Sequence, residues 1–212
     1  MKNIYSGILA ATFFILCGNA ASAPILNDNF DTELGSNVLN YNSFENWDVL
    51  DGTADIISNG GFGISCFNGV GKCVDLDGSS SNAGILISKE IYNFLPGTYE
   101  LTFALSGNQR GGNSDSVTVS LGSIFSEIFT KLPTDPFENF TRTILVSDSF
   151  SANLVFNHAG NDNVGLILDN VSLTSVPVPP SVFLFLSGIL GLGALKKDIF
   201  VVRTQQNVTR RP

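Results

Sequence analysis

The sequence is poor in histidine, cysteine and basic residues, and each shortage excludes a class of function. Its 212 residues include one histidine, three cysteines and eleven lysines and arginines. A zinc hydrolase therefore lacks its ligands, and a serine hydrolase would have to use His158 without any Gly-x-Ser-x-Gly elbow. The glycine-rich stretch 107–112 also lacks the Lys-Ser/Thr of a phosphate-binding loop. The many acidic residues leave open only paired carboxylates for glycoside cleavage, and no spacing marks such a pair.

The few basic residues are distributed unevenly along the chain. Residues 24–174 carry eighteen acidic and five basic side chains, a net charge of −13, whereas residues 175–212 carry one acidic and five basic side chains. An acidic domain of this kind is unsuited to binding nucleic acid, so we expect no nucleic-acid partner. The acidic composition suits a soluble extracellular domain, including one that holds divalent cations.

A hydrophobic segment at the N-terminus predicts export. Lys2 precedes an apolar run at 8–16, and Ala21-Ser22-Ala23 supplies the small residues that signal peptidase accepts. Residues 1–23 therefore read as a signal peptide with the Sec translocon and signal peptidase as partners. We expect the mature chain to begin at Pro24.

A second apolar segment lies at residues 182–195 and is followed by Lys196 and Lys197. A bilayer core about 30 Å thick needs roughly 20 helical residues, so this segment fits a transmembrane helix, with a buried terminal helix of a soluble domain as the alternative. The prolines at 177, 179 and 180 favour an extended linker over 175–181. The lysine pair would stop transfer, which leaves 196–212 as a basic cytoplasmic tail.

The end of the chain resembles the PEP-CTERM sorting tail in the order of its parts. These parts are the proline motif Val176, Pro177, Val178, Pro179 and Pro180, the apolar run with Ser-Gly at 187–188, and the two lysines. The resemblance implies an exported protein of a Gram-negative bacterium, anchored in the inner membrane until an exosortase-like transpeptidase cuts near the proline motif. The protein would then reach the cell surface or the extracellular matrix and act there as a non-catalytic structural or adhesive component of exopolysaccharide or biofilm.

The middle of the chain has the pattern of many short strands. Apolar and β-branched residues alternate with polar ones or cluster in eight segments, at 53–58, 73–76, 84–88, 98–105, 116–121, 140–146, 153–157 and 164–173. Turn signals rich in glycine, asparagine and aspartate separate these segments, and no stretch of the domain shows a sustained helical period with caps. We therefore predict that residues 24–174 form an all-β domain, an antiparallel β-sandwich of jelly-roll type.

Several short motifs of this domain resemble the galactose-binding-like jelly rolls, which include non-catalytic carbohydrate-binding modules. The motifs are Phe30-Asp31, the strand at Trp47, Leu95–Leu101 and Leu168–Leu173. The resemblance implies a structural Ca²⁺ between the N-terminal segment and the last strand, with Asn27, Asp31 and Asp169 as ligands. Acidic residues at 75–78 and 48–55 are rival sites, and solvated turn carboxylates are the alternative to any calcium site.

Two cysteines remain after signal cleavage, Cys66 and Cys73. In an oxidising compartment, thiols with six residues between them most simply form a disulfide that closes a small loop. A metal site is the alternative, with His158 as its only available imidazole.

Binding of an extracellular polysaccharide would use aromatic side chains to stack on sugar rings and a polar loop to donate hydrogen bonds. The aromatic candidates are Trp47, Tyr41, Tyr92 and Phe62, and the loop candidates are Arg110 with Asn108, Gln109 and Asn113. For each aromatic residue the alternative is packing in the core. Besides the structural or adhesive role, a carbohydrate-binding module with structural calcium and an extracellular hydrolase remain as functional hypotheses.

Overall fold

A computed structural model describes residues 24–80, 82–160 and 162–177, and these residues form an antiparallel β-sandwich. The predicted fold class is confirmed. The predicted signal peptide, transmembrane helix and basic tail lie outside the described residues, as do Val178, Pro179, Pro180, Lys196 and Lys197. Within the described part, no helix has the length and apolar character needed to cross a membrane.

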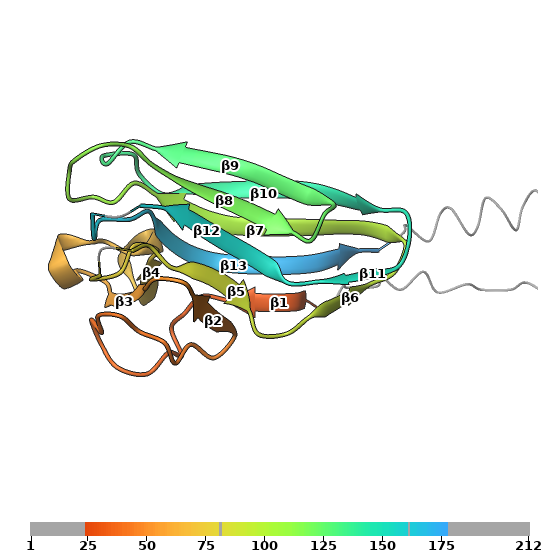
Figure 1. Ribbon diagram of the computed structural model, residues 1–212, viewed down its shortest axis with the longest axis horizontal. Helices are drawn as coiled ribbons and strands as arrows, with labels where there is room; N and C mark the ends of the chain where they lie inside the picture. The colour runs from red at the N-terminus through yellow and green to blue at the C-terminus, as the bar shows by residue number, and fades with distance from the viewer. Residues whose placement is uncertain (1–23, 81, 161, 178–212) are drawn as a thin grey trace, which may run out of the picture. The chain divides into compact units, whose positions relative to one another are not determined.

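The long strands of both sheets run along one common direction (Figure 1). The first sheet has the order β10 (Glu138–Val146), β7 (Gly97–Ser106), β13 (Ile167–Val176), β4 (Lys72–Asp75) and β3 (Asp55–Ser58), and β1 (Pro24–Asp28) also pairs with β13. The second sheet has the order β2 (Trp47–Leu50), β5 (Ile85–Ser88), β12 (Leu154–Ala159), β8 (Asp115–Leu121) and β9 (Phe125–Lys131). A separate ribbon pairs β6 (Tyr92–Phe94) with β11 (Phe150–Ala152).

The alternating residue pattern explains which side of each strand faces the core. In β8 the side chains of Val117, Val119 and Leu121 are buried while the threonine and serine between them are partly exposed, which is the period of two expected for a half-buried strand. Aromatic rings then fill the space between the sheets. Phe103 packs edge-on against Phe156 with ring centroids 5.4 Å apart, and each such buried side chain contributes about 1.5–3 kcal/mol.

Ion pairs close one open side of the sandwich, between the edge strands β9 and β10. Arg142 donates two hydrogen bonds of 2.6 Å to the carboxylate of Glu127, and its guanidinium lies over the ring of Phe129, 5.1 Å from the centroid. Lys131 and Glu138 form a second pair at 2.6 Å. Charges that point toward the core at an edge strand hinder pairing with another chain, so we interpret these pairs as edge protection.

The structure differs from the sequence-based prediction in several strands. β1, β6, β9 and β11 were not among the predicted segments, and β13 continues to Val176, two residues beyond the predicted end of the domain. His158, which the sequence places in a turn, lies in β12. It takes the next core-facing position after Leu154 and Phe156, so the alternation of the strand extends further than the turn residues suggest.

The partners of β13 change along its length. One edge of β13 pairs with β7, while its other edge pairs first with β4, at Ile167 and Leu168, and then with β1, from Val171 onward. The ladder with β7 is irregular between Asp169 and Ser172, and Asn170 has a left-handed backbone with φ of 49°. This interruption directs Asp169 and Asn170 into the gap between β4 and β1.

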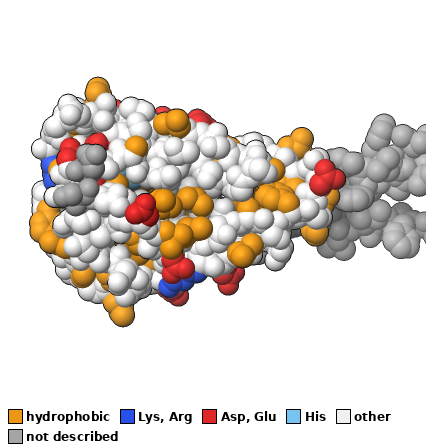
Figure 2. Space-filling model, viewed as in Figure 1, with side chains coloured by type: hydrophobic (Ala, Val, Ile, Leu, Met, Phe, Trp, Pro, Cys, Tyr) orange, Lys and Arg blue, Asp and Glu red, His pale blue; other side chains and the backbone are white. Residues whose placement is uncertain are grey.

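The surface is sparsely basic and only locally apolar. Figure 2 shows one face of the molecule, on which hydrophobic side chains gather in the middle while basic side chains are few. The most exposed large apolar residues are Leu34, Leu145, Leu95 and Ile128, and they belong to different parts of the fold. Singly exposed apolar residues of this kind are ordinary in soluble domains.

Candidate functional site

The predicted disulfide is present, and it braces a loop that contains two short 3-10 turns. Cys66 and Cys73 are joined with a Cα–Cα distance of 5.4 Å, and η1 (Gly61–Gly63) and η2 (Phe67–Gly69) lie in the surrounding loop. In Figure 1 this loop lies at the end of the sandwich opposite to β6 and β11. The alternative of a cysteine metal site is thereby wrong.

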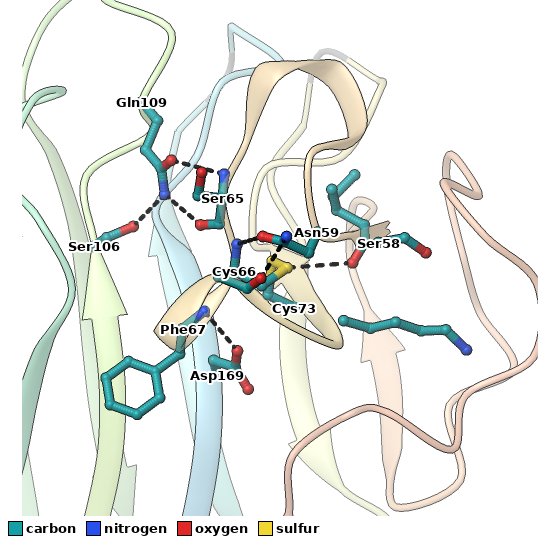
Figure 3. The surroundings of a disulfide bond; sticks show 12 residues. Ser58, Asn59, Ser65, Cys66, Phe67, Cys73, Ser106, Gln109 and Asp169 are labelled. Atoms are coloured by element: carbon teal, nitrogen blue, oxygen red, sulfur yellow. Dashed lines mark hydrogen bonds between the residues drawn. A yellow bond between two sulfur atoms is a disulfide. The ribbon is translucent and has the colours of Figure 1, made fainter.

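Side-chain amides fix this loop further (Figure 3). The amide of Gln109 accepts a hydrogen bond from the Ser65 N–H and donates one to the Ser65 carbonyl, both at 2.9 Å. Asn59 accepts from the Cys66 N–H at 3.0 Å and donates to the Gly69 carbonyl at 2.6 Å. Gln109 thus does not offer its amide to a ligand, as the sequence suggested, but holds the disulfide loop.

A first pocket lies beside this loop, and we call it the loop-end pocket. It has a volume of about 190 Å³ and is lined by Asn29, Asp31, Phe67, Asn68, Val70, Asp169 and Asn170. The gap between β4 and β1 creates the space, because no strand pairs there with the irregular part of β13. Gly71, with φ of 69°, is required nearby since a Cβ at that position would collide with the Asp31 carboxylate.

The two carboxylates of the loop-end pocket are already engaged by protein donors. Asp31 accepts from the backbone N–H of Lys72 and from the side-chain amide of Asn29, both at 2.8 Å. Asp169 accepts from the backbone N–H of Phe67 at 3.1 Å and from the backbone N–H of Asn170 at 2.7 Å. Burial, together with the like charges of nearby aspartates, raises the pKa of Asp169 to about 7.

These residues do not fit the predicted calcium site. Asp31 and Asp169 do line one pocket, the loop-end pocket, whereas Asn27 lines a different one. Ca²⁺ takes six to eight oxygen ligands, and within the described part of the chain no group of three or more His, Cys, Asp or Glu residues is arranged to hold a metal. The carboxylates order the turns around them instead.

A second and larger pocket lies at the side of the sandwich, and we call it the β1–β6 pocket. It has a volume of about 400 Å³ and is lined by Ile25, Leu26, Asn27, Glu45, Asn46, Lys89, Glu90 and Tyr92. Its apolar side comes from β1 and β6, and its polar groups come from Asn27 of β1, the loop before β2 and the turn after β5.

Hydrogen bonds between these two loops hold the β1–β6 pocket in shape. The Lys89 backbone N–H donates to the Asn46 carbonyl at 2.9 Å, and the Lys89 ammonium donates to the Phe44 carbonyl at 2.5 Å. The Asn46 amide in turn donates to the buried carboxylate of Asp28 at 3.0 Å. The pocket is therefore built by the fold and does not depend on a ligand to form.

Trp47 shares the Asp28 carboxylate with Asn46 of this pocket, but it is a core residue. Its side chain is fully buried, packs against Phe156 with ring centroids 5.7 Å apart, and donates its indole N–H to Asp28 at 2.8 Å. The prediction that Trp47 stacks on a sugar is wrong, because β2 directs this side chain between the sheets. Tyr41 is also buried and donates its hydroxyl to Glu33 at 3.1 Å.

Arg110 also has a different role from the predicted one. Its guanidinium forms an ion pair with Asp75, whose side chain is fully buried, while the Arg110 side chain is 26% exposed. Burial raises the pKa of Asp75 to about 7, and the charge of Arg110 opposes that shift. The loop that carries Arg110 is held by Asn108, whose amide donates to Asp115 at 2.9 Å. Arg110 thus stabilises a buried carboxylate and offers little of its guanidinium to a glycan.

His158 does not provide a general base. Its side chain is 4% exposed, its Nε2 accepts a hydrogen bond from the Leu166 N–H at 3.1 Å, and burial lowers its pKa to about 4. A neutral, buried imidazole with its acceptor nitrogen occupied is not available to a substrate. The sequence already lacked a nucleophile elbow, and the position of His158 agrees with that absence.

Comparisons with known proteins give similarity of fold alone. No protein-family model matches the chain, and no curated protein is similar to it in sequence. Among solved structures, a cleaved adhesin domain of Lys-gingipain from Porphyromonas gingivalis matches at 18% identity with a TM-score of 0.49, over 72% of this chain and 98% of that one. The xylan-binding domain CBM22-1 from Paenibacillus barcinonensis matches at 10% identity with a TM-score of 0.44, over 74% and 97%.

A third similar structure is much longer than this chain. The mosquito-larvicidal Cry4Aa toxin of Bacillus thuringiensis matches at 13% identity with a TM-score of 0.41, over 62% of this chain. The match spans only 22% of the toxin. Similarities at this level do not show that two proteins bind the same ligand, so the function follows below from the geometry of the β1–β6 pocket.

Proposed function

We propose that this chain is an exported, non-catalytic β-sandwich that binds extracellular polysaccharide in the β1–β6 pocket. The observation that carries the proposal is a preformed pocket of about 400 Å³ that joins an apolar side to a rim of amide, carboxylate and ammonium groups. A sugar ring presents the same combination, since its C–H face is apolar and its hydroxyls are polar. Pockets of small-molecule sites also begin at about 300 Å³.

The role in the cell is part of the same proposal. The signal peptide and the PEP-CTERM-like tail would take the protein through the inner membrane to the cell surface or the extracellular matrix. Polysaccharide bound in the β1–β6 pocket would then give the protein a structural or adhesive function there. The net negative charge of residues 24–174 favours solubility of such a domain and disfavours its binding to nucleic acid.

Binding is tested with the full chain in mild detergent against neutral and charged oligosaccharides, by calorimetry. We expect at least one oligosaccharide to bind and its affinity to fall about tenfold in Asn27→Ala, because this exposed amide lines the pocket and its side chain bonds to none of the described residues. Asn139→Ala is the matched control, an exposed amide on β10 that is remote from the pocket in the sheet order. Equal loss in both variants, or no binding by any oligosaccharide, would refute the proposal.

Export is tested separately by fractionating cells and measuring the intact mass of each form of the protein. A secreted species that ends within 175–181 supports sorting at the proline motif. A membrane-held species that retains Pro212 would show that the tail is a permanent anchor and would refute the sorting part of the proposal.

A further inference from the structure

The charges of the β1–β6 pocket are not balanced within the protein. Among the described residues there are three ion pairs, Arg110–Asp75, Lys131–Glu138 and Arg142–Glu127, and none of them lies at this pocket. The pocket nevertheless contains two carboxylates, those of Glu45 and Glu90, which therefore lack a cationic partner.

The single cation that lines the pocket, Lys89, balances only one of these two carboxylates. The Lys89 ammonium donates to the Phe44 carbonyl, on the side of the loop before β2. Among the described residues, the Glu45 carboxylate accepts a hydrogen bond only from the hydroxyl of Thr32, at 3.1 Å, and none donates to the Glu90 carboxylate. The pocket thus has a surplus of negative charge and of hydrogen-bond acceptors.

The turn that carries Glu90 is fixed in position. The Asn153 amide donates to the carbonyls of Ser88 and Glu90 at 2.7 and 3.1 Å, and the Ser88 hydroxyl donates to the same Glu90 carbonyl at 2.9 Å. The backbone carbonyl of Glu90 therefore accepts two of these hydrogen bonds, while no described residue donates to its carboxylate. The turn is therefore ordered before a ligand binds, so its backbone loses little conformational entropy on binding.

The remaining walls define the rest of the ligand. Ile25, Leu26 and Tyr92 supply an apolar surface, and Asn27 adds an amide at the rim. A ligand that complements all of these groups carries an apolar ring face, hydroxyls and one positive charge. An ammonium group satisfies carboxylate acceptors with charge-assisted hydrogen bonds, whereas a uronate or sulfate would be repelled by them.

We infer that the β1–β6 pocket selects a saccharide unit with a free amino group, a hexosamine, over neutral and anionic sugar units. The inference rests on the proposed function and adds to it the chemical class of the ligand. Glu45 and Glu90 receive the ammonium group, and the apolar side of the pocket receives the ring.

The test compares four oligosaccharides of equal length with the full chain at pH 6, where a sugar amine is protonated. They consist of glucosamine, N-acetylglucosamine, glucose and galacturonate. We expect glucosamine to bind at least tenfold more tightly than the neutral sugars, and this advantage to shrink as salt is added. Galacturonate is expected to bind most weakly.

Two variants locate the effect. Glu90→Gln and Glu45→Gln should each reduce glucosamine affinity about fivefold while the affinity for N-acetylglucosamine stays the same, because only the amine needs the carboxylate charge. Asp48→Asn is the matched control, an exposed carboxylate on β2 outside the pocket, and it should change neither affinity. An equal fall in Asp48→Asn would mean that the overall acidity of the domain attracts the amine, which would overturn the inference.

The outcomes separate this inference from the proposed function. If glucose or N-acetylglucosamine binds as tightly as glucosamine and Asn27→Ala weakens both, the pocket binds saccharides and the selection of amines is refuted. If galacturonate binds best, the charge argument is refuted. If none of the four binds, both the inference and the binding proposal fail.

Discussion

Replacement of Arg110 by alanine should destabilise the protein in a manner that depends strongly on pH. Arg110 pairs with Asp75, which is fully buried, so the variant leaves a carboxylate without its cation inside the protein. Removing one member of a buried ion pair costs about 3–5 kcal/mol. Because the Arg110 side chain is 26% exposed, we expect a value at the lower end, about 3 kcal/mol at pH 8.

At low pH the same substitution should cost much less. The pKa of Asp75 is raised from 3.8 to about 7 in the folded protein, so at pH 5 this carboxyl is protonated with Arg110 present. Without Arg110, whose charge lowers that pKa, the carboxyl remains protonated at pH 5 as well. The loss then reduces to one hydrogen bond from a charged donor, about 1.5 kcal/mol. The penalty for Arg110→Ala therefore grows by about 1.5 kcal/mol as pH rises from 5 to 8, one unit above the folded pKa of about 7.

Urea unfolding at the two pH values measures this difference. With a denaturant slope of about 2 kcal/mol per molar urea, the midpoint should fall by about 1.5 M at pH 8 and by about 0.75 M at pH 5. Adding Asp75→Asn to Arg110→Ala should recover most of the loss at pH 8, because no charge is then left buried. Arg142→Ala is the control and should lose the same amount at both pH values, since Arg142 lowers the pKa of Glu127 and keeps it ionised. A loss for Arg110→Ala that does not differ between pH 5 and pH 8 would refute this reasoning.

Three further predictions concern other parts of the fold. Replacing both Cys66 and Cys73 by serine should lower the free energy of unfolding by about 2–3 kcal/mol, measured by urea unfolding, and an unchanged midpoint would mean that the loop is held by its hydrogen bonds alone. Trp47→Phe should lower the free energy of unfolding by about 2 kcal/mol, because the buried Asp28 loses the indole donor. In the native protein this single Trp should fluoresce at the short wavelengths of a buried indole until the protein unfolds. Asp169→Asn should lower the free energy of unfolding more at pH 5 than at pH 8. The pKa of Asp169 is raised from 3.8 to about 7 in the folded protein, so the native protein loses stability as pH rises through that interval, whereas the asparagine variant does not. Equal effects at both pH values in thermal melts would contradict this.

The sequence predicted best the strands in which apolar and polar residues alternate regularly. The segments 98–105 and 116–121 correspond to β7 and β8, which lie inside their sheets and bury every second residue over most of their length. β9 was missed because it is an edge strand in which Phe129 is the only large apolar residue that is buried. An edge strand needs few core-facing residues, so its periodicity is weak.

The candidate site was predicted less well than the fold. Of the residues proposed as ligands from the sequence, only Asn27 and Tyr92 line the β1–β6 pocket, and Asn27 was proposed for calcium. Glu45, Lys89 and Glu90 lie in turns that carry no motif, and no local pattern indicates that β1 brings its side chains beside theirs. Aromatic residues were favoured for sugar binding, but the sequence does not state on which side of the short strand β2 a tryptophan lies.

The sequence by itself determined the class of the fold, the disulfide and the acidic surface, because these follow from residue periodicity, from two thiols close in the chain and from composition. Only the tertiary structure decided which polar residues meet. The pairing of β13 first with β4 and then with β1 opened the loop-end pocket, and the contact of Lys89 with Asn46 and Phe44 built the β1–β6 pocket. Such contacts join residues more than forty positions apart, and their geometry depends on strand order and twist, which no local pattern in the sequence encodes.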